Sequence, residues 1–332
     1  MVKVFGIGNA LVDIMTSLKG DNLLSELKLP KGSMQLVDSS TIDKAIAKTE
    51  GLKQTLASGG SAANTINGLA NLGFETGFVG KVGDDEMGAF FSNDMKKNGI
   101  NPTLLIGKAP TGRALALVSP DSERTFAVNL GAAIEMVPSD LQLEHFSGYN
   151  YFHIEGYLVQ NHGLIEKALL LAKQAGLFIS LDLASYNVVE ANLSFLQDMI
   201  KKYVDIVFAN EEEAKAFTGD DPEKALTEIA QMVNIAVVKI GAKGSLIQSG
   251  KETFKVGVID VKPIDTTGAG DMYASGFLYG LGNNLPLNQC AQIGAVLSGK
   301  VIEKMGPKMD SKTWEEIKVL VERITNGETL TK

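Results

Sequence analysis

The chain has 332 residues and a formal net charge of −8, from 31 lysines and arginines against 39 aspartates and glutamates. This acidic balance argues against nucleic-acid binding, because a protein that neutralises many phosphates normally carries an excess of basic residues. The single cysteine, Cys290, excludes an intrachain disulfide and a multi-cysteine metal site, and it favours a reducing compartment. No stretch approaches the roughly 20 apolar residues of a membrane span, and no export signal is apparent, so we expect a cytoplasmic protein without membrane contact.

Short apolar runs alternate with helical patterns along most of the chain, which predicts an α/β fold with a mostly parallel sheet. The predicted strands are Val2–Ile7, Glu75–Val79, Tyr149–Ile154, Phe178–Leu183, Ile206–Ala209 and Ala236–Ile240. The predicted helices are Ala62–Leu72, Glu86–Asn98, Gly163–Ala175, Glu211–Phe217, Ala225–Met232, Met272–Gly280 and Leu287–Met305. Each strand is followed by a polar or glycine-containing turn, as buried parallel strands commonly are.

Two stretches, 15–37 and 104–129, interrupt this alternation. Period-2 segments at Arg113–Val118 and Thr125–Asn129 flank the turn 120–122, so we expect a small antiparallel β-sheet there. We predict that this sheet forms a lid over one end of the main sheet, which would keep water from a reaction; an edge extension is the alternative. Residues 1–14, 38–103 and 130–332 would then form the large nucleotide- and substrate-binding domain.

The segment Asp265–Asp271 (DTTGAGD) stands directly before a strong helical pattern. Glycines at the start of a helix let a ligand approach the backbone, and the first amides of the helix carry partial positive charge that suits a phosphoryl group. Asp271 would stand at that point as either a helix cap or a general base. The small residues Gly268, Ala269 and Gly270 favour the base, because a cap does not require them.

Four motifs resemble those of the ribokinase (PfkB) family of carbohydrate and nucleoside kinases. They are Asp265–Asp271 continued by MYASGFL, Ser58–Asn64 (SGGSAAN), Gly80–Gly88 (GKVGDDEMG) and Asn210–Glu213 (NEEE). The resemblance runs from Gly8 to about Gly306. It implies a ribokinase-like three-layer α/β domain with a small β-sheet lid, and ATP with Mg²⁺ as phosphate donor.

Further segments are most similar to the adenosine kinase branch of this family, namely Gly8–Asp13, Tyr203–Glu211, Pro110–Gly112 and Asn129–Ala133. The chain departs from that branch at Glu155 and Leu158, where those kinases have a small residue and an aromatic ring. Tyr157 or Phe126 would then have to stack on a nucleobase.

The resemblance places the residues around the phosphate acceptor, which are Asn9, Asp13, Gly60, Ser61 and Asn64. Asp13 and Asn64 offer oxygens or amides suited to the vicinal hydroxyls of a ribose. Taken singly, Asn9 and Asp13 are also ordinary turn and cap residues, and 58–61 is an ordinary helix start.

On the donor side, the resemblance implies roles for Asn210, Glu213, Lys239, Gly241 and Gly244. Asn210 and Glu213 suit the outer shell of a magnesium ion, which prefers oxygen ligands and keeps its waters. A glutamate-rich run is more often a solvated helix face, and Lys239, where the family usually has threonine, is nearly as well explained as a surface lysine.

Two further roles come from the resemblance. Arg124 in the lid would reach the transferring phosphate with its planar, permanently charged fork; an exposed hairpin charge is the alternative. Some members of the family respond to potassium, and Asp265 with Thr267 stands at the matching place.

We therefore expect an ATP-dependent kinase of a hydroxymethyl group, with Asp271 as base and with Gly268, Ala269, Gly270 and Arg124 stabilising charge. Adenosine is the favoured acceptor. A sugar such as ribose, fructose or 2-keto-3-deoxygluconate is the alternative, and a catalytically silent regulator is the second one. The partners would be small molecules, and the chain would act as a monomer or a homodimer.

Overall fold

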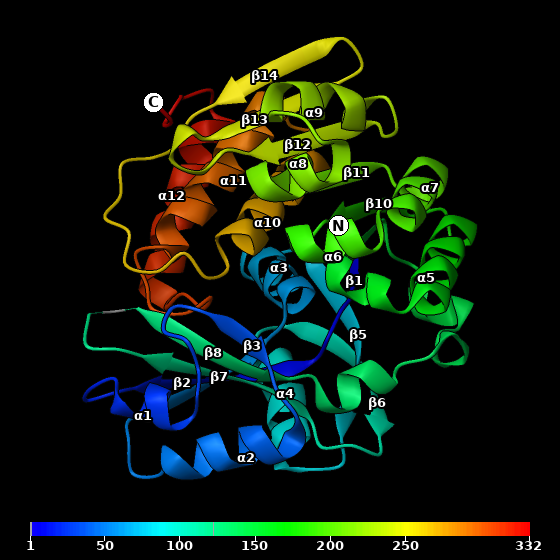
Figure 1. Cartoon of the computed structure of the whole chain (residues 1–332). Coiled ribbons are helices and arrows are strands. Elements are labelled where there is room, and N and C mark those ends of the chain that lie inside the picture. Colours follow the sequence, from blue (N-terminus) through cyan, green and yellow to red (C-terminus); the bar gives the residue numbers. More distant parts are fainter. Residues whose placement is uncertain (1, 122) are drawn as a thin grey trace.

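The computed structural model describes residues 2–121 and 123–332. Met1, and Ser122 in the predicted hairpin turn, lie outside the described residues. Figure 1 shows a large α/β body with a smaller β-sheet below it.

The large sheet carries the predicted strands, and its order is typical of a doubly wound fold. In spatial order its strands are β14 (Glu252–Val256), β13 (Ser245–Ser249), β12 (Ile235–Lys239), β11 (Ile206–Asn210), β10 (Phe178–Asp182), β9 (Tyr151–Glu155), β1 (Lys3–Ile7), β5 (Glu75–Gly83) and β6 (Ile100–Gly107). The strands from β12 to β6 run parallel, whereas β13 and β14 run antiparallel at one edge. The mostly parallel sheet predicted from the alternating pattern is confirmed.

Helices cover both faces of this sheet, which gives the three layers. In chain order the helices are α1 (Asn22–Glu26), α2 (Ser39–Lys48), α3 (Ser61–Asn71), α4 (Glu86–Lys97), α5 (His162–Gln174), α6 (Tyr186–Ala191), α7 (Leu193–Tyr203), α8 (Glu211–Thr218), α9 (Pro222–Ala230), α10 (Ala269–Gly282), α11 (Leu287–Val301) and α12 (Ser311–Thr325). Apolar residues of α5, α7, α8 and α9 pack on one face, and those of α3, α4, α10 and α11 pack on the other. Helix α12 packs outside α11 (Figure 1).

The small sheet is mixed rather than antiparallel. Its order is β3 (Met34–Leu36), β8 (Arg124–Asn129), β7 (Gly112–Val118), β2 (Leu11–Ser17) and β4 (Gln54–Gly59). The predicted β7–β8 pair is antiparallel, as is β2–β4, but β2–β7 and β3–β8 are parallel. Because β2 and β7 each continue from a parallel strand of the large sheet, β1 and β6, they enter the small sheet in the same direction.

The membership of the two sheets differs from the predicted ranges. Strand β6 belongs to the large sheet, although its second half lies within the predicted lid range 104–129. Strand β4 and residues 11–14 of β2 belong to the small sheet, although we expected them in the large domain. β6 is an edge strand with several half-exposed residues, so its sequence does not have the continuous apolar pattern of a central strand.

His153 has a structural role in the core. It is buried in β9, where its Nδ1 lies 2.9 Å from Ser180 Oγ, and burial lowers its pKa to about 4.

None of the helices in residues 2–121 and 123–332 is long and apolar enough to cross a bilayer.

Candidate active site

A cavity of about 970 Å³ opens at the carboxyl ends of the parallel strands, where open α/β sheets bind their ligands. Phe126 and Asp13 of the small sheet line one side of it, so the small sheet borders the cavity at this end of the large sheet. The predicted site residues that line the cavity are Asp13, Gly60, Ser61, Asn64, Asn210, Glu213, Lys239, Gly241, Gly244, Thr267, Ala269, Gly270 and Asp271.

The glycine turn before α10 has the conformation that its sequence requires. Gly268 is the N-cap of α10 with φ of +76°, and a Cβ there would lie 2.7 Å from Pro307 Cβ. Only glycine accepts both the left-handed backbone and this close approach without strain. The amide of Ala269 donates to Thr266 O (3.2 Å), and Asp271 follows in the first turn of the helix. The positive end of the helix dipole therefore faces the cavity beside a carboxylate.

Asp271 is held by two side chains from the start of α3. Ser61 Oγ donates to Asp271 Oδ1 (2.7 Å), and Asn64 Nδ2 donates to Asp271 Oδ2 (2.9 Å). Burial raises the pKa of Asp271 to about 6, although these two hydrogen bonds act to lower it. A carboxylate with such a pKa is ionised at neutral pH and is still basic enough to accept a hydroxyl proton. The N-terminal and C-terminal motifs of the chain thus meet at one carboxylate.

The start of α3 is itself fixed by a glycine. Gly60, the N-cap of α3, has φ of +100°, and a Cβ there would lie 2.2 Å from the carbonyl oxygen of Asn9. The loop after β1 and the first turn of α3 can approach each other only because no side chain stands between them.

Asp13, on β2, faces Asp271 across the cavity. Its carboxylate lies directly against Gly59, where a Cβ would be 2.4 Å from Asp13 Cγ. Burial raises the pKa of Asp13 to about 7, with the Lys308 ammonium lowering it and Asp271 raising it. The two carboxyl groups therefore lie close enough for the charge on Asp271 to affect the pKa of Asp13.

Asn9 does not line the cavity. Its backbone amide and Nδ2 donate to Glu155 Oε1 (2.9 and 2.7 Å), and Glu155 Oε2 accepts a bond from the amide of Ala62 (2.9 Å). Glu155 is 1% exposed, and burial raises its pKa to about 7. Asn9 thus supports the loop that leads to Asp13, and its amide group is bonded to Glu155 rather than pointing to an acceptor.

Arg124 of the lid reaches the loop before the glycine turn. It forms a buried ion pair with Asp265, and its Nη1 donates to Thr267 Oγ1 (2.5 Å). Burial lowers the pKa of Arg124 to about 10, so the guanidinium stays charged at neutral pH. The small sheet is therefore joined to the loop before α10 by a charge pair.

At the place matched to potassium, the Asp265 carboxylate accepts bonds from three protein donors. Asp265 accepts the amides of Thr267 (2.7 Å) and Gly306 (2.5 Å) as well as the Arg124 guanidinium. These three donors take up three of the roughly four acceptor positions of the carboxylate, so a monovalent cation would have to share Asp265 with Arg124 and stays a prediction from the resemblance.

The side of the cavity where the resemblance implies the donor is built on β11 and β12. Asn210 and Glu213 form a capping box at the start of α8, in which Asn210 N donates to Glu213 Oε2 (2.8 Å) and Glu213 N donates to Asn210 Oδ1 (2.8 Å). Asn210 Nδ2 also donates to Glu213 Oε1 (2.6 Å). Lys239, the last residue of β12, pairs with Asp182 (2.8 Å). Gly241 and Gly244 both have positive φ, and a Cβ on Gly244 would lie 2.0 Å from Val256 O.

These oxygens suit a magnesium ion carried by phosphates rather than one caged by the protein. Across residues 2–121 and 123–332, no group of three or more histidine, cysteine or acidic residues is arranged to hold a metal ion. Both oxygens of Glu213 accept bonds from Asn210. They would therefore meet water ligands of the ion rather than coordinate the ion directly.

Sequence reasoning missed two charged residues at this site. Asp182 ends β10 and lines the cavity, and Lys308 places its ammonium near Asp13, Asp94 and Asp271. Asp182 had a usable signal, because it is an acidic residue at the carboxyl end of a predicted strand. Lys308 had none, because the chain brings it to the cavity through a loop after α11.

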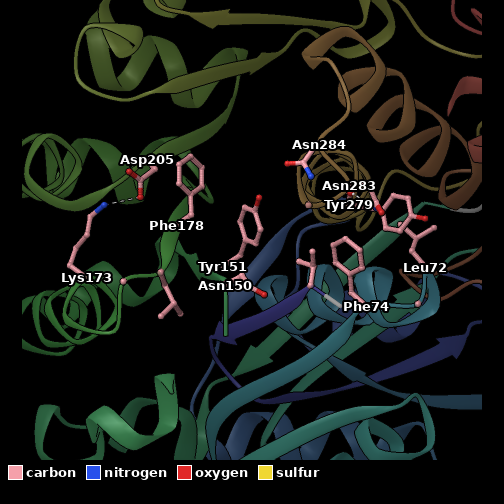
Figure 2. A pocket seen from close by; sticks show the side chains of 15 residues that line it. Leu72, Phe74, Asn150, Tyr151, Lys173, Phe178, Asp205, Tyr279, Asn283 and Asn284 are labelled. Carbon is pink, nitrogen blue, oxygen red and sulfur yellow. Dashed lines mark hydrogen bonds and ion pairs between the residues drawn. The ribbon is translucent and has the colours of Figure 1, made fainter. Parts of the chain in front are cut away.

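A second cavity, of about 930 Å³, opens at the amino ends of the strands (Figure 2). Its walls carry the rings of Phe74, Tyr151, Phe178 and Tyr279 and the Lys173–Asp205 ion pair (2.8 Å). It has neither a glycine turn at a helix start nor facing carboxylates among its lining residues, so it lacks the groups of a phosphoryl-transfer site.

The comparisons with known proteins agree with this geometry. Residues 34–314 match the pfkB family of carbohydrate kinases. The chain belongs to this family. The probable sugar kinase from Rhizobium etli CFN 42 is 33% identical, with a TM-score of 0.86 over 96% of this chain and 98% of that one. The adenosine kinase from Sinorhizobium meliloti is 32% identical, with a TM-score of 0.86 over 96% and 99%.

A relative with another named acceptor is comparably similar. The 5-dehydro-2-deoxygluconokinase of Shouchella clausii is 30% identical over 281 residues, which cover 80% of this chain and 86% of that protein. The fold of this pfkB kinase is thus shared by nucleoside and sugar kinases, and its acceptor has to be inferred from the site.

Proposed function

We propose that the chain is an ATP-dependent kinase that phosphorylates the hydroxymethyl group of a nucleoside, with adenosine as the favoured acceptor. The observation that carries the proposal is the hydrogen-bonded set of Asp271, Ser61 and Asn64 at the glycine turn of α10. A basic carboxylate beside a helix N-terminus is the arrangement that in-line phosphoryl transfer needs.

The reaction is one displacement at the γ-phosphorus. Asp271 removes the proton of the acceptor hydroxyl as the oxygen attacks; the new P–O bond forms while the bond to the β-phosphate oxygen breaks, and ADP leaves. The turn at Gly268, Ala269 and Gly270 stabilises the charge on the phosphoryl oxygens. Mg²⁺ bound to the phosphates would neutralise charge on the donor.

The acceptor and donor lie on opposite sides of Asp271. Asp13 is placed to hold hydroxyls of the acceptor, with Gly60, Ser61 and Asn64 beside it. Asn210, Glu213, Lys239, Gly241 and Gly244 face the donor, and Asn210 with Glu213 would meet water ligands of the magnesium ion. Asn9 does not contact the acceptor, but its bonds to Glu155 hold the loop that leads to Asp13.

Adenosine is favoured because two aromatic side chains, Phe126 of the lid and Tyr157 after β9, line the cavity and offer faces for a nucleobase. The likeness to the Sinorhizobium meliloti adenosine kinase supports the same acceptor. A sugar is the second candidate, because Leu158, where the adenosine kinases have a stacking ring, is 5% exposed and packs in the core. The Shouchella clausii relative favours a sugar as well.

The test is ADP release with MgATP and a panel of acceptors: adenosine, inosine, guanosine, ribose, fructose, 2-keto-3-deoxygluconate and 5-dehydro-2-deoxygluconate. We expect the highest kcat/KM with adenosine. Turnover confined to a sugar would contradict adenosine as the acceptor but support the phosphoryl-transfer reaction. No turnover with any of these acceptors would favour a catalytically silent nucleotide-binding protein.

A further inference from the structure

Lys239 and Asp182 form an ion pair across the carboxyl end of the sheet. Lys239 ends β12 and Asp182 ends β10, with β11 between these strands, and Nζ lies 2.8 Å from Asp182 Oδ2. The two side chains are 15% and 9% exposed. Asp182 is itself fixed, because its Oδ1 accepts the amide of Ala184 (3.0 Å).

The ammonium of Lys239 lies directly against the phosphate-binding turn. A Cβ on Gly270 would be 3.1 Å from Lys239 Nζ, and Nζ is the atom that such a Cβ would meet. Glycine at this position therefore leaves room for a cation beneath the turn, one residue before Asp271.

The surroundings keep this cation charged. Burial acts to lower the pKa of Lys239, but the carboxylates of Asp182 and Glu213 outweigh it and raise the pKa. An ammonium has three donors, and Asp182 takes one of them. Arg124, the other cation near the turn, is paired with Asp265 and Thr267.

We propose that Lys239 is a catalytic residue whose ammonium binds the γ-phosphoryl group during transfer, and that Asp182 is the positioning residue that holds it under the turn. The proposal rests on the proposed kinase function and deepens it. A fixed positive charge stabilises the transition state strongly because negative charge spreads over the equatorial oxygens in a site that excludes water. A threonine, usual here in the family, can donate one neutral hydrogen bond but supplies no charge.

The kinetic test compares Lys239→Met and Asp182→Asn with a matched control. Lys81→Met breaks an ion pair of the same length, Lys81 Nζ to Asp140 Oδ2 at 2.8 Å, that does not line the cavity. We expect Lys239→Met to lower kcat about 10²–10³-fold, and Asp182→Asn about tenfold, with the acceptor KM changed less than about threefold. Lys81→Met should leave kcat within about twofold.

A binding test separates this proposal from the proposed function, because it needs no acceptor. We expect Lys239→Met to weaken the magnesium complex of AMP-PNP about tenfold by calorimetry and that of ADP less than about threefold, since ADP has no γ-phosphoryl group. Equal weakening of both nucleotides, or an unchanged kcat in the folded variant, would overturn the role of Lys239. If Lys239→Met does not fold, the kcat of Asp182→Asn and its affinities for AMP-PNP and ADP test the role of Lys239 instead. If the wild-type chain turns over no acceptor but Lys239→Met selectively weakens AMP-PNP binding, the kinase function is contradicted and the contact between Lys239 and the γ-phosphoryl group is supported.

Discussion

Two cavities of similar volume open at opposite ends of the large sheet, about 970 Å³ at the carboxyl ends of the strands and about 930 Å³ at the amino ends. The first contains carboxyl groups whose pKa burial raises to about 6 or 7, at Asp13, Glu213 and Asp271. The second has a charge pair in which Lys173 is 37% exposed. Volume alone does not distinguish them.

The two cavities differ in how many carboxyl groups are buried in them, and burying an ionised carboxylate is energetically unfavourable. Keeping carboxylates away from water disfavours their ionised form, so such groups persist where chemistry uses them or where a structural network satisfies them. Asp271 combines an elevated pKa with a glycine turn and a helix N-terminus, whereas Asp205 in the other cavity joins α5, β10 and the loop before β12 by accepting bonds from Lys173, Ile179 N and Asn234. If this chemical difference is a functional one, substitutions at the carboxyl-end cavity should lower activity and those at the amino-end cavity should not.

The largest effect is expected from Arg124→Ala. It removes the charge that links the lid to Asp265 and Thr267, and we expect kcat to fall about 10²–10³-fold. Arg113→Ala is the control, because Arg113 is also a lid arginine paired with a carboxylate, Asp43, at 2.7 Å. Steady-state ADP release measures both, and a loss of less than about tenfold in Arg124→Ala would refute its role.

Asp13→Asn should act on the acceptor rather than on the donor. An amide replaces one carboxylate oxygen by a donor, so we expect the acceptor KM to rise about 10–100-fold while the KM for ATP changes less than about threefold. Thermal unfolding checks that the variant folds. A parallel rise in both KM values would show that Asp13 supports the cavity as a whole.

The pH dependence should follow the two facing carboxyls. Asp271 must be ionised to accept a proton, and the pKa values of Asp271 and Asp13 are raised to about 6 and about 7, so kcat/KM should fall as the pH drops through this range. Asp13→Asn should leave a single acidic limb near 6. A kcat/KM that stays constant down to about pH 5 would contradict the assignment.

Asp271→Asn should stabilise the fold slightly. The pKa of Asp271 rises from 3.8 to about 6 on folding, so its contribution to stability is present below about pH 4 and is lost as the pH rises through 6. At pH 8 the amide avoids the buried charge, and we expect a gain on the order of 1 kcal/mol, or about 2 °C in Tm. A clear loss of Tm would mean that the bonds from Ser61 and Asn64 outweigh the burial of charge.

The central strands and helices could be predicted from the sequence because each carries a local pattern. Ile206–Asn210 and Ile235–Lys239 are continuous apolar runs, and both are buried parallel strands. Helix α12 (Ser311–Thr325) was not predicted, although Asp310 caps it by accepting the amide of Thr313 (2.8 Å). The strand pairing in the small sheet was not predictable locally, because the direction of β2 and β7 is set by the strands that precede them in the large sheet.

The candidate site divides in the same way. Gly60, Gly268 and Asp271 stand in compact motifs, and the positive-φ backbones of the two glycines follow from local sequence. The hydrogen bonds from Ser61 and Asn64 to Asp271 do not follow from it, because they join segments 210 and 207 residues apart. The Glu155–Asn9 and Lys239–Asp182 contacts join segments 146 and 57 residues apart, so no sequence window contains both partners. The family resemblance places Asn9 at the acceptor, and its bond to Glu155 is visible only in the fold.

The most direct measurement is ADP release at pH 8 from MgATP and adenosine by the wild-type chain, Asp271→Asn and Asp205→Asn in parallel. Asp205 is a matched control at the amino-end cavity, because it also accepts bonds from a backbone amide and side chains. We predict a loss of at least about 10²-fold in kcat for Asp271→Asn and less than about twofold for Asp205→Asn. Equal losses in the two variants, or full activity of Asp271→Asn, would contradict the assignment of the chemistry to the carboxyl end of the sheet.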